Sequence, residues 1–78
     1  EPVFDGVFRV ASWRRVGERH LKLALQPEAG GAELSAIHFG GWTGQAPAGR
    51  VHVAYQLEPD DWNGRRGVQL LVRHLQPA

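Results

Sequence analysis

The sequence predicts a small all-β domain. Hydrophobic residues recur at every second position in three separate stretches, which is typical of strands with one buried face. Glycine, proline and asparagine gather between these stretches, where they favour turns. No segment shows a convincing 3.6-residue period of the kind that indicates an amphipathic helix. At 78 residues, the chain is long enough for one domain with one core.

Two strands are expected in the N-terminal third. The first covers residues 7–16, and its irregular alternation predicts a β-bulge. A tight break at Gly17 and Glu18 separates it from a second strand over 20–25, where leucine occupies every second position. Because strand side chains point alternately to two faces, these leucines are expected to face the core.

Three further strands are expected after a loop that contains Gly30 and Gly31. A weaker third strand covers 33–39, and the sequence does not decide which of its faces is buried. The fourth and fifth strands, over 51–57 and 68–73, alternate regularly. The Asn63-Gly64 pair between them is a strong hairpin signal, because both residues tolerate a positive φ.

The segment 40–49 is rich in glycine and proline, and at most one helical turn is expected in it, over 42–46 with Thr43 as a possible cap. Five short strands with a gap after the third fit the Greek-key barrel of the OB type, in which the helix often found in that gap would here be degenerate or absent. An SH3-like barrel is the second possibility. Closure into a barrel is attractive because it removes exposed strand edges.

Composition narrows the possible roles. The chain has no cysteine, which excludes disulfides and thiolate metal sites, and no methionine, which predicts a segment taken from a longer protein. Its formal net charge of +1 is too small to indicate nucleic-acid binding by itself. No stretch approaches the roughly 18 apolar residues of a membrane helix. We therefore expect a monomer without membrane contact, in the cytoplasm.

Positive charge is concentrated in two stretches that each contain tryptophan, at the turns that join the first two and the last two predicted strands. In an OB barrel these two loops flank the same ligand face. Guanidinium groups bind phosphate and an exposed indole stacks on an unpaired base, so a single-stranded nucleic acid is the expected ligand. The candidate binding residues are Arg14, Arg15, Arg19, His20, Lys22, Trp62, Arg65 and Arg66.

A structural role for the same residues stays open. The arginines are also explained as solvated surface, and Asp60 and Asp61 would repel phosphate or pair with nearby arginines across the hairpin. Trp13 is expected in the barrel wall. Trp42 is expected to plug the barrel or pack on another domain, and Trp62 is expected to be exposed.

Catalytic signals are missing from the sequence. The four histidines do not share metal-ligand spacing, and Asp60 and Asp61 have no further acids beside them. The two serines lie in no activating motif, and the glycines form no phosphate-binding loop. The sequence therefore predicts no catalytic residue and no metal ligand in this chain.

Six short segments follow one another in an order that is informative as a set, although no single segment is specific by itself. They are residues 1–4, 16–23, 36–39, 51–57, 62–64 and 68–72. This ordered set resembles the OB-fold domain of the RecJ family of bacterial single-strand-specific 5′→3′ exonucleases, and the resemblance covers nearly the whole chain.

The resemblance implies that residues 1–78 are one OB domain from a larger enzyme of the DHH phosphoesterase type. Such enzymes hold Mn²⁺ or Mg²⁺ in Asp/His clusters, which this chain lacks, so metal and catalysis would belong to other domains of the longer protein. The implied role is to grip single-stranded DNA and guide it to that core during DNA repair and recombination. The positions that match the family's binding side are Arg14, Arg15, His20, Lys22, Trp62 and Arg65.

A scaffolding role is the alternative. Trp42 and the apolar, glycine-rich segment 40–49 would then pack on the parent enzyme's catalytic domains or recruit a protein.

Overall fold

The computed structural model describes residues 2–59 and 67–78, and within them it contains strands and no helix. All of the predicted strands are confirmed; the third is shorter than expected, and the other four are longer. They are β1 (Phe4–Val16), β2 (His20–Pro27), β3 (Leu34–His38), β4 (Arg50–Pro59) and β5 (Val68–Pro77).

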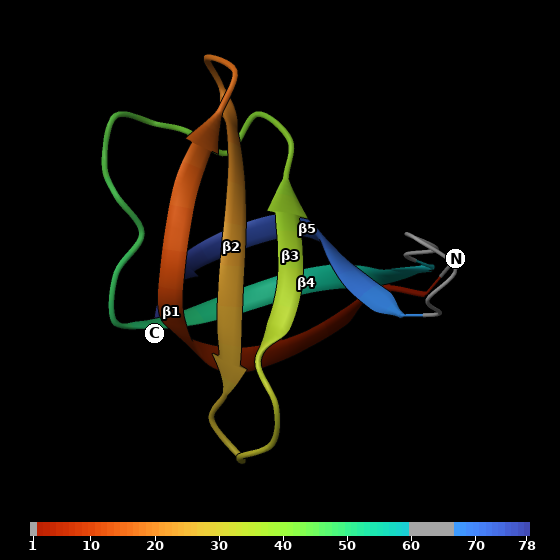
Figure 1. Cartoon of the computed structure of the whole chain (residues 1–78). Helices are drawn as coiled ribbons and strands as arrows, with labels where there is room; N and C mark the ends of the chain where they lie inside the picture. Colours follow the sequence, from red (N-terminus) through yellow and green to blue (C-terminus); the bar gives the residue numbers. More distant parts are fainter. Residues whose placement is uncertain (1, 60–66) are drawn as a thin grey trace.

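The strands form a closed barrel in the order β1-β2-β3-β5-β4, and β4 pairs back onto β1 (Figure 1). Neighbouring strands are antiparallel except β3 and β5, which are parallel and close the barrel. The chain does not pass directly from β3 to its neighbour β5, because β4 comes between them in the sequence. β5 runs antiparallel to β4 and parallel to β3. This order and the closed sheet confirm the Greek-key barrel of the OB type.

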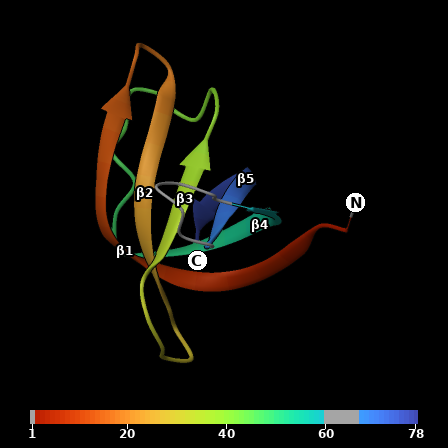
Figure 2. The ribbon, with the colours of Figure 1, turned by 45° about the vertical axis from the view of Figure 1, so that its right-hand side comes forward.

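β1 is long because it pairs with two neighbours. Its first part pairs with β4 and its second part with β2, and the strand curves strongly between them (Figure 2). The β1–β2 register shifts between Val10 and Ser12, which confirms the predicted bulge. A bulge adds one residue to one strand and bends it, so it lets one strand belong to both walls of the barrel.

The core is made of the alternating apolar positions. The leucines of β2 are buried as expected, and so are alternate residues of the other strands. In the weaker third strand, Ala36 is the residue that faces inward. The buried set is Phe8, Leu21, Leu23, Leu25, Ala36, Val51, Val53, Leu70 and Val72.

The long connection between β3 and β4 contains no helical turn, so the helix of this gap is absent rather than reduced to the single turn considered over 42–46. Gly44 has a φ of +95°, which a right-handed helix does not permit. The backbone of Trp42 is also held elsewhere, because its N–H donates to the carbonyl oxygen of Arg19 at 2.8 Å. The indole of Trp42 packs against the core, as expected for a residue that plugs the barrel.

Candidate nucleic-acid interface

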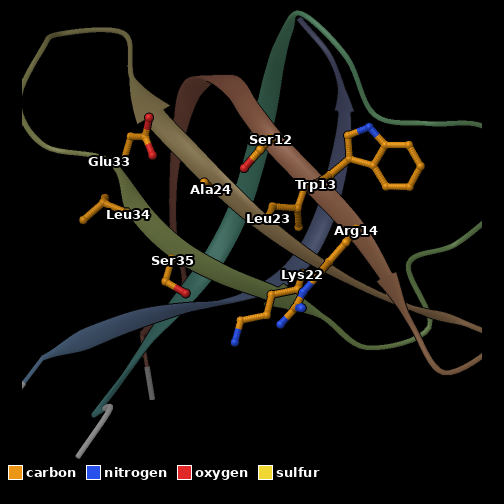
Figure 3. Close-up of a pocket in the computed structure, with 9 residues that line it drawn as sticks. All are labelled: Ser12, Trp13, Arg14, Lys22, Leu23, Ala24, Glu33, Leu34 and Ser35. Carbon is orange, nitrogen blue, oxygen red and sulfur yellow. The ribbon is translucent and has the colours of Figure 1, made fainter. Parts of the chain in front are cut away.

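Arg14 and Lys22 face each other across β1 and β2 on the outer surface of the barrel. Both line an open hollow of about 410 Å³, together with Ser12 and Ser35. In Figure 3 the two cationic side chains extend side by side, whereas the indole of Trp13 points away from them. The hollow therefore offers two adjacent positive charges with hydroxyl groups nearby, a combination that suits phosphate oxygens.

The side chain of Arg15 points to the opposite face of β1 from that of Arg14, because successive side chains alternate along a strand. It pairs with the buried Leu21, and its guanidinium carbon lies 5.4 Å from the ring centre of Trp42. Trp42 in turn stacks on Trp13, with ring centres 5.6 Å apart and planes 20° apart. Arg15 thus makes a cation–π contact within the chain, and the expected single basic cluster is divided between two surfaces.

His20 lies on the outer surface and has a defined orientation. Its Nδ1 accepts a hydrogen bond from the backbone N–H of Gly40 at 2.9 Å, so in the neutral ring Nε2 carries the proton. Gly40 has a φ of +71°, a conformation that glycine adopts easily. Arg19 is exposed in the β1–β2 turn, next to His20 in the chain.

The charge around the hollow is mainly positive but not exclusively so. Among residues 2–59 and 67–78, no carboxylate lies within salt-bridge distance of Arg14 or Lys22. Arg50 pairs with Glu28 at 2.7 Å, and His52 lies 3.7 Å from Asp5, both away from the hollow. Glu33 lines the hollow at the side opposite Arg14 and Lys22 (Figure 3). The positive field is therefore local to the Arg14–Lys22 pair.

Three of the candidate residues, Trp62, Arg65 and Arg66, lie outside the described residues, as do Asp60 and Asp61. The expectation that the β4–β5 loop flanks the same face as the β1–β2 turn stays a prediction.

Sequence reasoning missed Phe39 as a surface residue. Phe39 follows β3 directly, and 59% of its surface is exposed. The irregular alternation within 33–39 does not by itself distinguish an inward face from an outward one. The register shows that Ala36 faces the core, which places residues 35 and 37 on the outer side. Phe39 lies one residue past β3, and its ring contact with His20 places it beside the outer face of β2.

His38 directly precedes Phe39 at the end of β3, and it lines a second hollow of about 490 Å³ together with residues of the segment 40–49. Its buried Nδ1 has no hydrogen-bond partner in the described part of the chain. Burial lowers the pKa of His38, and the nearby His74 lowers it further. Both effects favour the neutral form of this histidine.

The described residues contain no group of three or more metal-ligating side chains. They also contain no helix long and apolar enough to cross a membrane.

Comparison with known proteins identifies the family. The family model of the RecJ OB domain matches residues 1–74. The single-stranded-DNA-specific exonuclease RecJ of Dickeya dadantii is 45% identical to this chain over 80 aligned positions. The corresponding exonuclease of Escherichia coli is 39% identical. In each case the match covers 99% of this chain and 14% of the relative, so the chain spans about one seventh of their length.

A solved structure has the same fold. The crystal structure of RecJ from Thermus thermophilus, a complex with Mg²⁺, contains a region that superposes on the whole chain. The TM-score is 0.77 and the sequence identity 25%, and the match covers 12% of that protein. The family model, the curated relatives and the shared barrel agree, and the chain belongs to the RecJ OB-domain family.

Proposed function

We propose that this chain is the single-stranded-DNA-binding domain of a longer RecJ-type exonuclease that degrades DNA in the 5′→3′ direction. The domain guides the strand towards a phosphoesterase core in the remainder of the protein. Its setting is DNA repair and recombination in the cytoplasm, and the domain itself acts as a monomer. Its partners are single-stranded DNA and the catalytic domains of the same enzyme.

The observation that carries this proposal is the Arg14–Lys22 pair. Two cations without a described carboxylate partner line an open hollow with two serine hydroxyls. Lys22 lies on β2, one of the two strands whose face OB barrels use for ligands, and Arg14 lies beside it on β1. An extended strand of phosphates crossing β1 and β2 would meet both cations.

Hydrolysis belongs to the rest of the longer protein in this proposal. The described residues hold no metal-ligating cluster, and the chain spans 14% of its curated relatives. When bound by the catalytic domains, Mn²⁺ or Mg²⁺ would activate water against the phosphodiester. This chain binds the single strand and orients it, which raises the local concentration of the strand at that centre.

The test is a titration of the chain with a short mixed-sequence single strand and with its duplex, followed by tryptophan fluorescence at several salt concentrations. Trp13 borders the hollow and supplies the signal. We expect binding to the single strand that weakens as salt is added, and weaker binding to the duplex. Equal affinity for both, or no binding at low salt, would contradict the proposal.

A contact surface for another domain is the second candidate, and exposed apolar residues where β4 ends and β5 begins support it better than Trp42 does. Trp42 is already engaged with Trp13 and Arg15. Leu57 and Val68, by contrast, are 52% and 54% exposed where β4 ends and β5 begins. Exposed apolar groups of this kind often mark an interface.

The variant Leu57→Asp tests whether Leu57 contacts another domain in the full-length enzyme or is exposed to solvent there as well. In the 78-residue chain the variant should unfold at nearly the wild-type denaturant concentration, because Leu57 is exposed. In the full-length enzyme the same change should lower the denaturation midpoint of this domain, because a charge would be buried in the interface. Equal effects in both proteins would count against the contact surface.

A further inference from the structure

Phe39 is a large aromatic side chain on the surface at the end of β3. It is 59% exposed, and it does not belong to the core or to the residues packed on it. A single apolar side chain on a surface is common in proteins, so exposure alone does not mark a site. What distinguishes Phe39 is its neighbours, which fix its ring and carry positive charge.

The ring of Phe39 is held in place by His20. The two rings meet edge to face, with centres 5.4 Å apart and planes 78° apart. His20 is itself fixed by the backbone N–H of Gly40 at 2.9 Å. In an edge-to-face pair at most one face of each ring is covered, so the contact with His20 leaves at least one face of the Phe39 ring uncovered. A ring that is already oriented loses little entropy when it binds a ligand.

The same face of the sheet carries the two cations. Arg14, Lys22 and Ile37 form one row across β1, β2 and β3. Val16 and His20 form the next row, which the contact with Phe39 extends. Adjacent rows on one face are two residues apart along a strand, or about 7 Å. A phosphate on the cations and a base on Phe39 therefore fit within one nucleotide or two neighbouring nucleotides.

The two described tryptophans are less suited to this role. Trp13 and Trp42 stack on each other, and Arg15 lies over the Trp42 ring. Trp42 also packs against the core. Inserting a base between them would break contacts that the barrel already makes, whereas stacking on Phe39 would break none of the contacts described.

We infer that Phe39 is a base-stacking residue of this chain: it takes one unpaired nucleobase of a single strand whose phosphates lie against Arg14 and Lys22. The inference rests on the proposed function, and it adds the aromatic contact that the cationic pair lacks. His20 is a positioning residue for the ring. Stacking is tolerant of sequence because every base has a π face, so this contact would not select among bases.

The experiment compares a short oligothymidylate with an abasic strand of the same length, which has the same phosphates and no bases. Wild type should bind the oligothymidylate about tenfold more tightly. Phe39→Ala should bind the two strands alike, with an unchanged dependence of affinity on salt. Phe39→Trp should restore the preference. Leu57→Ala, at an equally exposed apolar position off this face, should behave as wild type.

The outcomes separate this inference from the proposed function. If wild type binds neither strand at low salt, the proposed function fails and the inference fails with it. If wild type binds but Phe39→Ala keeps the preference for bases, the stacking role of Phe39 alone is overturned, and the exposed ring serves a protein contact instead. Because Phe39 is exposed, its replacement by alanine should leave the fold intact, which the denaturation midpoint checks.

Discussion

His38 owes its unusual environment to the glycine three residues later. A Cβ placed on Gly41 would fall closer to Nδ1, Cγ and Cβ of His38 than real Cβ atoms come. The missing side chain lets the segment 40–49 fold back over the imidazole, and the N–H of Gly41 donates to the carbonyl oxygen of His38 at 3.1 Å. The ring is thereby partly removed from water, which explains why burial is the main cause of its lowered pKa.

This environment predicts a dependence of stability on pH. The pKa of His38 is lower in the folded chain than its ordinary value of 6.5, so the unfolded chain binds the proton more tightly. The contribution of neutral His38 to the free energy of unfolding is complete above about pH 6.5, and it is lost as the pH falls through the folded-state pKa. Urea unfolding at about pH 7.5 and pH 5.5 should show a loss of stability in wild type that is smaller in His38→Gln.

Comparing how the unfolding free energy changes with pH in wild type and in His38→Gln separates the titration of His38 from any loss of packing. A variant that only packs less well would lower the unfolding free energy equally at both pH values. His74→Gln should retain most of the pH dependence, because the charge of His74 is the smaller cause of the shift. Identical pH slopes in wild type and His38→Gln would show that this histidine does not titrate differently on folding.

At the scale of the elements, the segment 40–49 takes the place that a helix has in other barrels of this type. It has no regular structure, yet Trp42 anchors it through a backbone hydrogen bond to Arg19 and through stacking on Trp13. The indole also packs against the buried core. A single residue, through its backbone N–H and its indole, thus attaches an irregular segment to the β1–β2 hairpin.

Replacing this anchor should be costly. We expect Trp42→Ala to lower the unfolding free energy by about 2–3 kcal/mol, from lost burial and stacking. Arg15→Gln, which removes only the cation–π contact, should cost about 0.5–1 kcal/mol. For a chain of 78 residues with a total stability of about 4–12 kcal/mol, urea denaturation resolves both changes. A Trp42→Ala variant as stable as wild type would mean that the segment is not part of the cooperative fold.

The elements also show where sequence reasoning was sufficient. Period-two alternation located β2, β4 and β5, and the weaker apolar runs between turn signals located β1 and β3. The irregular alternation of the first run also indicated its bulge, because this signal is local. The same alternation separates Arg14 from Arg15, a consequence that reading the two as one basic cluster overlooked. The contact between Trp13 and Trp42 joins residues far apart in sequence, and no local pattern indicates it.

At the scale of the whole molecule, the fold was predictable because closure of a short all-β chain leaves few alternatives. The candidate site was predictable only in part. Arg14, Lys22 and His20 share the outer face, whereas Arg15 lies in the aromatic stack. Phe39 emerged only from its exposure and its contact with His20 in the folded chain. Placing a surface residue depends on register, which turns and long-range pairing fix together.

The formal net charge of +1 means that binding must depend on local charge rather than on the field of the whole domain. Affinity of the isolated chain should accordingly be modest and sensitive to salt. Each phosphate neutralised on a single strand contributes about −0.7 to the slope of log K against log salt concentration. Three to five contacts would give a slope of about −2 to −3.5.

The most direct measurement is this salt slope for wild type and for Arg14→Gln/Lys22→Gln, with an end-labelled single strand and fluorescence anisotropy. The double variant should bind more weakly, with a slope less negative by about 1.4. Arg73→Gln, which removes an exposed arginine from β5, should keep the wild-type slope. Equal slopes in wild type and the double variant would show that phosphates do not lie on the β1–β2–β3 face, and would contradict the central claim.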